Sequence, residues 1–188
     1  MNNKAVIDHI VNWLRSYSEQ SGTKGFVVGI SGGIDSALTS TLCARTNKTV
    51  IVLSLPIRQH AAEFNRSTAH ISWLKEMFPN VSSHEVNLAE PFGQLEKTFP
   101  ATIQDHLTMA NTRSRLRMLT LYAFAGHHQL LVVGTGNKVE DFGVGFFTKY
   151  GDGGVDVSPI ADLLKSEVKN LSIELGILPE IIAALPTD

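Results

Sequence analysis

The chain has 188 residues, of which 43% are apolar and 18% charged, and its formal net charge is −2. This length and apolar content predict one domain, over residues 1–188, with a buried core, and they exclude a disordered chain. A nearly neutral chain lacks the basic surface that binding to long nucleic acid needs. A single cysteine cannot form an internal disulfide, so a small disulfide-stabilised domain is excluded and a cytoplasmic location is favoured. No apolar run approaches the roughly 18 residues of a membrane span.

Helices and strands are predicted to alternate along the chain. Helical periodicity covers residues 6–17, 34–45, 60–78, 103–126 and 159–175. Short apolar, β-rich runs predict strands at residues 26–30, 49–55, 84–88 and 129–133. This order predicts an α/β fold: a doubly wound parallel sheet with helices on both faces.

A glycine-rich stretch at residues 141–156 is too short to separate two domains. It contains Phe142, Phe146 and Phe147, which are unusual side chains for an idle surface loop. We therefore interpret it as a functional loop or lid, with a solvent-exposed crossover as the alternative.

The most informative segment is Gly29-Ile30-Ser31-Gly32-Gly33-Ile34-Asp35-Ser36, which lies between a predicted strand and a predicted helix. Ligands of open α/β sheets bind beyond the carboxyl ends of the strands, where this loop falls. Adjacent glycines let backbone N–H groups approach an anion, and the helix that follows adds its positive dipole end. Asp35 would repel a phosphate unless a magnesium ion lies between them. The segment thus predicts a site for a metal-bound polyphosphate.

Two common phosphate motifs are absent from this loop. It has no lysine, as the P-loop of NTPases requires, and Gly-x-Gly-x-x-Gly does not follow the strand. The remaining alternative is an ordinary helix N-terminus with Asp35 in its first turn.

The segment from Ser31 to Ser36 resembles the pyrophosphate loop of the ATP pyrophosphatase (PP-loop) superfamily, which has an adenine nucleotide alpha hydrolase-like fold. Members of that superfamily cleave ATP between its α and β phosphates to adenylate a substrate. Residues 111–118, 134–140, 145–156 and 186–187 resemble, in order, four motifs of the NAD synthetase family.

The resemblance implies a set of ligand contacts. The implied ATP contacts are Gly29, Ile30, Ser31, Gly32, Gly33, Ile34, Asp35, Ser36, Thr135, Lys165 and Thr187. Arg115, Lys149 and Asp156 match contacts to deamido-NAD. Asp35 and Glu140 match the carboxylates that hold Mg²⁺.

Helical spacing sorts the arginines of residues 111–118 onto two faces. Arg115 shares one face with Asn111 and Met118, whereas Arg113 and Arg117 lie on the opposite side. Since one face alone can border the site, we expect Arg113 and Arg117 to be solvated.

The activity that the resemblance implies is ATP-dependent amidation of deamido-NAD by ammonia, through an acyl-adenylate. Two alternatives remain open: a related enzyme that adenylates another acceptor, and a truncated, inactive nucleotide-binding homologue. The family pattern continues for several tens of residues beyond residues 186–187, where this chain ends at Asp188. The chain has no room for a glutaminase domain, so we expect free ammonia as nitrogen donor. We also expect a homodimer, and neither nucleic acid nor membrane as partner.

Overall fold

Four parallel strands form the centre of the computed structural model, which describes residues 2–184. In sheet order they are β3 (Val81–Glu85), β2 (Thr49–Ser54), β1 (Gly25–Gly29) and β4 (Leu131–Val132). The chain moves from β1 outward through β2 to β3 and then returns to place β4 on the other side of β1. The direction of winding therefore reverses beside β1, which is where such sheets bind ligands.

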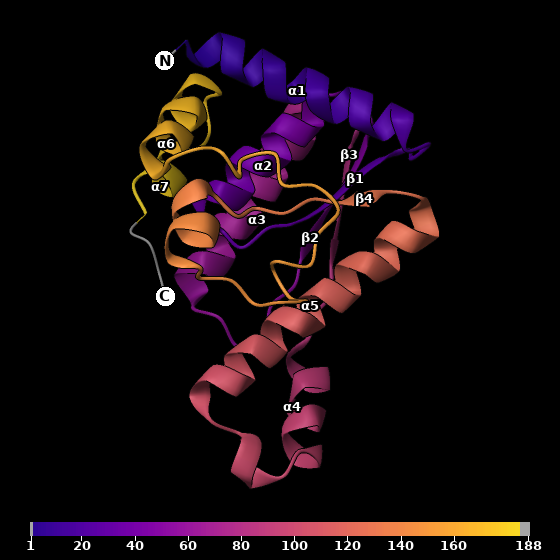
Figure 1. Cartoon of the computed structure of the whole chain (residues 1–188), viewed down its shortest axis with the longest axis vertical. Coiled ribbons are helices and arrows are strands. Elements are labelled where there is room, and N and C mark those ends of the chain that lie inside the picture. Colours follow the sequence, from indigo (N-terminus) through magenta and orange to yellow (C-terminus); the bar gives the residue numbers. More distant parts are fainter. Residues whose placement is uncertain (1, 185–188) are drawn as a thin grey trace.

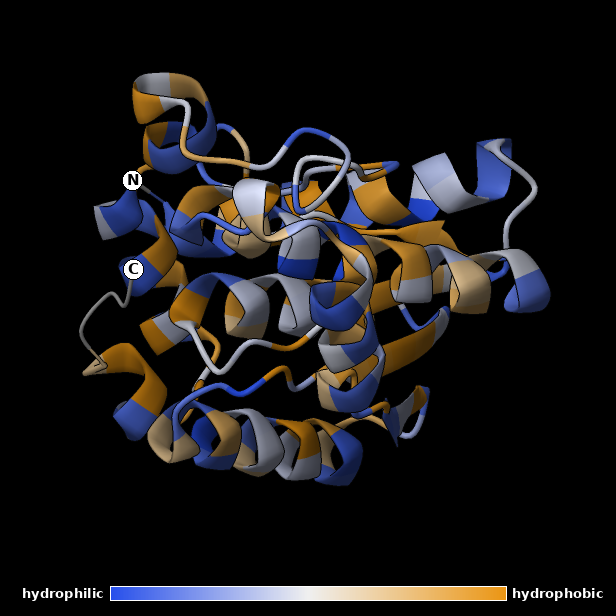
Figure 2. Cartoon of the chain, turned by 90° about the horizontal axis from the view of Figure 1, so that it is seen from below, coloured by the Kyte–Doolittle hydropathy of each residue, from blue (hydrophilic) through white to orange (hydrophobic). Residues whose placement is uncertain are grey.

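Helices cover both faces of the sheet, as predicted. Along β1, Phe26 and Val28 pack with the helices of one face, and Val27 packs with those of the other. The first face is covered by α1 (Asn3–Gln20), α2 (Ile34–Ala44), α3 (Ala61–Met77), α6 (Lys165–Glu174) and α7 (Pro179–Ile182). The second is covered by α4 (Ala89–Thr98) and α5 (His106–His128). Figure 2 shows helices of mixed hydropathy around a largely hydrophobic sheet.

Helix α5 reaches past the carboxyl edge of the sheet. Leu121 of α5 lies beside Gly29, the last residue of β1, so residues 106–117 lie beyond the strand ends. Figure 1 shows this half of α5, together with α4 and the 3₁₀ turn η1 (Ala101–Ile103), forming the lower end of the molecule. The wall that they make borders the site.

Several predicted boundaries were wrong. The third strand covers residues 81–85 rather than 84–88, because the Asn80 amide bonds the carbonyls of Ala44 and Lys48 and so brings Val81 opposite Val50. The last long helix starts at residue 165, since residues 157–164 are extended or turned and the Glu167 carboxylate accepts from the Leu164 N–H at its start.

Four helical segments were not predicted at all: α4, η1, α7 and the π-helix η2 (Lys138–Val144). Helix α4 contains Pro91 and Gly93, which weaken the helical signal. The π-helix η2 overlaps the start of the glycine-rich stretch, residues 141–156, that was predicted to be a loop. Among residues 2–184, no helix combines the length and the apolar character needed to span a lipid bilayer.

Candidate active site

The predicted phosphate loop lies at the carboxyl end of β1, where it leads into α2. The Ser36 hydroxyl donates to the Gly33 carbonyl (3.0 Å) and accepts from the Ser31 N–H (3.3 Å). Among the described residues, the N–H groups of Gly32, Ile34, Asp35 and Ser36 have no hydrogen-bond acceptor. These free donors, at the positive end of α2, form a concave site for an anion.

Helix α3 fixes the orientation of this loop by binding its carbonyl groups. Ser67 Oγ donates to the carbonyl of Ile30 (3.0 Å), and Arg66 Nε donates to that of Gly32 (3.1 Å). With the carbonyls held by α3, the N–H groups remain available on the other side. Gly32 has φ +89°, and a Cβ there would collide with the Glu63 carbonyl, so the close packing of α3 requires glycine.

The carboxylates of Asp35 and Glu140 share one cation. Lys165 Nζ lies 2.6 Å from Asp35 Oδ2 and 2.7 Å from Glu140 Oε1. On the other side of the pair, the amide nitrogen of Asn137 donates to Asp35 Oδ1 (3.1 Å) and to Glu140 Oε2 (2.9 Å). The fold therefore gathers three residues that the sequence placed at the ATP and metal sites, from α2, η2 and α6.

Negative charge exceeds positive charge at this cluster. Burial raises the pKa of Asp35 despite its contact with Lys165. Burial lowers the pKa of Lys165, but its bonds to Asp35 and Glu140 outweigh this and leave that pKa raised. Burial, together with Asp152, Glu140 and Asp35, raises the pKa of the neighbouring Asp141 to about 6. A cluster with this imbalance favours a further cation.

The donor set fits Mg²⁺. Two carboxylates that already converge on one cation supply the hard oxygen ligands that Mg²⁺ prefers. No group of three or more His, Cys, Asp or Glu side chains within residues 2–184 is arranged to hold a metal by itself. This too suits Mg²⁺, which keeps several waters and takes phosphate oxygens along with one or two carboxylates.

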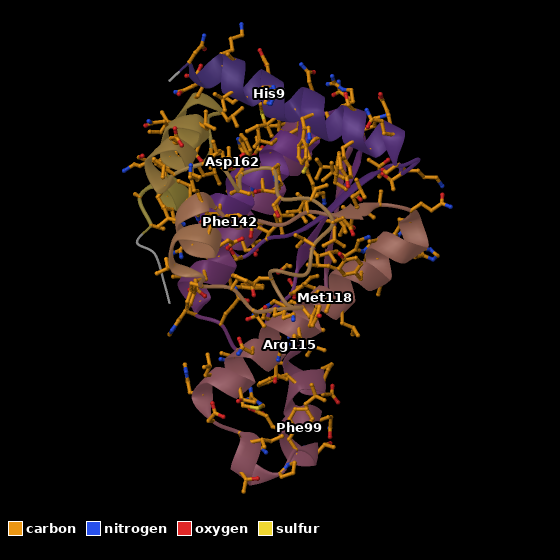
Figure 3. All side chains as sticks on the ribbon, in the orientation of Figure 1. His9, Phe99, Arg115, Met118, Phe142 and Asp162 are labelled. Carbon is orange, nitrogen blue, oxygen red and sulfur yellow. The ribbon has the colours of Figure 1, made fainter. Side chains whose placement is uncertain are left out.

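The segment after η2 is pinned to α5, and this brings Arg115 beside Lys149. Asp152 accepts from Ser114 Oγ (2.6 Å) and from the Thr148 N–H (3.0 Å), and Thr148 Oγ1 donates to Asn111 Oδ1 (2.7 Å). Arg115 Nε donates to the backbone carbonyl of Lys149 (3.2 Å). Both Arg115 and Lys149 have exposed side chains, and Figure 3 shows Arg115 on the part of α5 that projects beyond the sheet.

Asp156 lies between α5 and β4 and contacts both. One carboxylate oxygen accepts from the Val132 N–H (2.7 Å) and the other from the Tyr122 hydroxyl (3.0 Å). Burial and the nearby Asp156 raise the pKa of Tyr122 to about 12, so this hydroxyl remains a donor at neutral pH. Asp156 therefore holds β4 against α5, and this structural role is separate from the predicted contact with deamido-NAD.

The expectation that Arg113 and Arg117 are solvated was wrong. Arg117 is half-buried and its Nε donates to the carbonyl of Leu55 (3.1 Å), just beyond β2. The guanidinium of Arg113 lies over the ring of Phe92 of α4, 5.5 Å from its centre. The periodicity placed them correctly opposite Arg115 but gave no sign that α4 covers that side.

A hollow of about 370 Å³ opens at the carboxyl ends of β2 and β3. Its lining residues are Pro56, Arg58, Gln59, Ala61, Phe64, Asn87 and Ala89. This volume is in the lower part of the range of small-molecule sites.

The sequence missed Arg66, Ser67 and Asn137 as site residues. Nothing in a single sequence shows that α3 packs on the loop, although the position of Asn137 before Glu140 is typical of a helix N-cap. Thr135 is half-buried in the loop that follows β4. Thr187, a predicted ATP contact, lies outside the described residues.

At the switch point of this parallel α/β sheet lie a carboxylate pair and loop N–H groups that have no acceptor among the described residues. This arrangement is typical of proteins that bind a nucleotide through its phosphates. The family model described as NAD synthase matches residues 6–188. The chain belongs to the NAD synthase family.

Its relatives share most of this chain. The NH₃-dependent NAD⁺ synthetase of Alkaliphilus metalliredigens is 40% identical over 190 residues, which cover 96% of this chain and 75% of that protein. The enzyme of the same name from Sulfurisphaera tokodaii is 37% identical over 97% of this chain, but the match spans 63% of that protein's length.

Solved structures agree with this assignment. An NMN synthetase from Francisella tularensis superposes with a TM-score of 0.91 and 29% identity, over 100% of this chain and 76% of that one. An NH₃-dependent NAD synthetase from Campylobacter jejuni gives a TM-score of 0.88 and 28% identity, over 97% and 77%.

Proposed function

We propose that the chain, as one ATP pyrophosphatase domain over residues 1–188, amidates deamido-NAD with ammonia in an ATP-dependent reaction that yields NAD, AMP and pyrophosphate. The observation that carries this proposal is the set of N–H groups in the loop after β1 that have no acceptor within residues 2–184, beside the Asp35 and Glu140 pair. The two curated relatives described above are NH₃-dependent NAD⁺ synthetases, and this supports the choice of substrates.

The reaction requires two displacement steps, because a carboxylate is a poor electrophile and must first be activated. In the first, an oxygen of the nicotinate carboxylate attacks the α-phosphorus of ATP and pyrophosphate leaves. In the second, ammonia attacks the acyl carbon and AMP leaves with one of the original carboxylate oxygens. A proton from the attacking ammonia goes to solvent.

The chain contributes mainly positioning and charge stabilisation. The loop N–H groups and the hydroxyls of Ser31 and Ser36 would bind the departing pyrophosphate, and Lys165 would bind a phosphate after leaving the two carboxylates. Asp35 and Glu140 would hold Mg²⁺, which offsets the negative charge of the phosphates when it is bound. Arg115 and Lys149 would bind the dinucleotide, and we nominate no side chain as covalent nucleophile.

The decisive experiment incubates the purified chain with ATP, Mg²⁺, ammonium chloride and deamido-NAD labelled with ¹⁸O in its carboxylate. We expect equal amounts of NAD and pyrophosphate, with one ¹⁸O in each AMP. Pyrophosphate release that does not depend on deamido-NAD would indicate another acceptor. Absence of any product would support an inactive nucleotide-binding homologue.

Nicotinate mononucleotide is a second candidate acceptor. The observation in its favour is the TM-score of 0.91, over the whole chain, with the NMN synthetase from Francisella tularensis. The same adenylation and amidation would apply to the shorter substrate. The ratio of kcat/KM for the two acceptors, measured in one preparation, decides between them.

A further inference from the structure

Asn137 is the one residue among those described whose side chain contacts both Asp35 and Glu140 from the buried side of the pair. It is 0% exposed, at the start of η2. Neither composition nor the resemblance to relatives had placed it among the site residues. Its four hydrogen bonds divide into two groups with separate effects.

The amide oxygen of Asn137 caps the π-helix. It accepts from the N–H groups of Val139 (3.0 Å) and Glu140 (3.2 Å), which have no partner within the helix. These two bonds stabilise the start of η2. A serine or threonine oxygen can take over this role, because both residues are good N-caps.

The amide nitrogen of Asn137 joins the two carboxylates. It donates to Asp35 Oδ1 and Glu140 Oε2, so each carboxylate has one oxygen fixed by the same NH₂ group. Asp35 is in the first turn of α2 and Glu140 is in η2, so this NH₂ group, together with the Lys165 ammonium, offsets the repulsion between their like charges. No shorter side chain at residue 137 can reach both oxygens.

On the more exposed side of the carboxylate pair, Lys165 contacts the two oxygens that Asn137 leaves free. Its single ammonium nitrogen contacts the remaining oxygens, Asp35 Oδ2 and Glu140 Oε1, at 2.6 and 2.7 Å. The two carboxylates therefore present one oxygen each toward a common point that suits one cation.

We propose that Asn137 is a positioning residue that holds Asp35 and Glu140 at the separation at which a single divalent cation replaces the Lys165 ammonium between them. This inference rests on the proposed function only for the identity of the metal-bound nucleotide. The displaced lysine then becomes free to bind a phosphate, so arrival of the metal and engagement of Lys165 with the nucleotide are coupled. Asn137 is expected to touch neither substrate.

The test measures binding of Mn²⁺ alone to the full chain, from the electron paramagnetic resonance signal of free Mn²⁺, without nucleotide. Asn137→Ser keeps the cap and loses the bridge, and we expect it to weaken Mn²⁺ binding about tenfold or more. Lys165→Met removes the competing cation, and we expect it to tighten Mn²⁺ binding. Thermal unfolding is measured on every variant.

Asn80→Ser is the matched control. The Asn80 amide nitrogen also donates two hydrogen bonds, to the carbonyls of Ala44 and Lys48, but it lies far from the carboxylates, at the start of β3. We expect this variant to lower Tm and to leave the Kd for Mn²⁺ unchanged. Asn137→Ser should show the opposite pattern, with a small change in Tm and a large change in Kd.

Mn²⁺ affinities of Asn137→Ser and the parent within twofold of each other would overturn the inference, as would weaker binding in Lys165→Met. Asn137→Thr is a second variant with the cap preserved. If both Asn137 variants are unfolded at 25 °C, the residue serves the fold alone and the inference fails. Because the measurement needs no turnover, a chain that binds Mn²⁺ as expected but makes no NAD would refute the proposed function and leave this inference standing.

Discussion

Asp35, in the first turn of α2, and His70, which contacts α2 from α3, are titratable side chains whose polar contacts differ in their effect on charge. Asp35 keeps ionic and amide partners around its carboxylate. His70 of α3 is fully buried, its Nε2 meets Ser40 Oγ at 3.0 Å, and its Nδ1 has no partner among the described residues. The partners of Asp35 therefore stabilise its charged form, which can bind a cation, whereas the surroundings of His70 stabilise its neutral form.

Replacing Asp35 by asparagine tests the first role. We expect Asp35→Asn to lower the rate of pyrophosphate release by about 100-fold or more, because the loop would lose a metal ligand while the side-chain shape is kept. Asp162→Asn, at an exposed aspartate, is the control and should retain full activity. Activity of Asp35→Asn near that of the control would exclude Asp35 as a metal ligand.

The His70 environment predicts a pH dependence of stability. Burial lowers its pKa from 6.5 to about 4, so between these values the unfolded chain binds a proton that the folded chain does not. Stability from this residue is complete above pH 6.5 and falls toward pH 4, by roughly 3 kcal/mol over the window. Urea unfolding from pH 4 to 7 should show this loss.

His70→Gln separates this effect from others. Asp141, with its pKa raised to about 6, favours the folded state at low pH and so opposes His70 over the same window. Because Asp141 is present in both proteins, the difference between parent and variant isolates His70. A difference in unfolding free energy that does not vary with pH would contradict the assignment.

At the scale of elements, the phosphate loop depends on α3 as much as on its own sequence. Gly32 and Gly33 are adjacent, but only Gly32 has positive φ and faces the Glu63 carbonyl. At Gly33 (φ −93°) an added Cβ would lie 3.4 Å from the nearest atom, Ser31 Oγ. Comparing alanine substitutions at Gly32 and Gly33 therefore separates the effect of α3 packing from a general effect of reduced loop flexibility.

We expect Gly32→Ala to destabilise the fold by at least about 2 kcal/mol, through backbone strain and displacement of α3. Gly33→Ala should change stability by less than about 1 kcal/mol. Denaturant unfolding of both variants measures the difference. Equal losses would show that α3 does not constrain the loop.

Arg115 Nε bonds the carbonyl of Lys149, which is a predicted contact to deamido-NAD. We therefore expect Arg115→Ala to raise KM for deamido-NAD at least about tenfold with a smaller change in KM for ATP, since a charged hydrogen bond to the dinucleotide would be lost. Steady-state kinetics with each substrate varied in turn provides the measurement. Equal increases in both KM values would remove the assigned role.

The sequence predicted those elements whose cause is local. The strand and loop before α2 lie within about a dozen residues, and their apolar run and paired glycines predicted both correctly. The contact between Lys165 and Asp35 joins residues 130 positions apart, and residue spacing cannot show it. The resemblance placed both at the ATP site, but the bridge made by Asn137 and the cover that α4 provides for Arg113 required the folded chain.

At the scale of the whole molecule, large apolar side chains remain exposed on and near the candidate dinucleotide site. Leu119 of α5 is 62% exposed, close to Arg115, and Phe142 of η2 is 72% exposed (Figure 3). Apolar groups gathered around a site often mark an interface. We propose that the chain forms a homodimer through the α5 side; the cytoplasmic location stays a prediction.

Sedimentation velocity of the purified chain tests this proposal. We expect a dimer, and we expect Leu119→Glu to shift it toward monomer because a charge would be buried at the interface. Ile173→Glu, at a 56% exposed residue of α6 on the opposite face of the sheet, is the control and should leave the dimer intact. A monomeric parent chain, or dissociation by both variants, would contradict the proposed surface.

The ammonium of Lys165 reaches back to a carboxylate near the beginning of the chain. Because Asp35 and Lys165 are 130 residues apart, a ribosome must synthesise all of the intervening chain before these charges meet. A nascent chain that ends before α6 contains Gly32 and Gly33 but lacks the lysine that pairs with Asp35. Nucleotide binding that depends on Lys165 should therefore appear only after α6 has been synthesised and has packed on the sheet, so its appearance can report that step of folding.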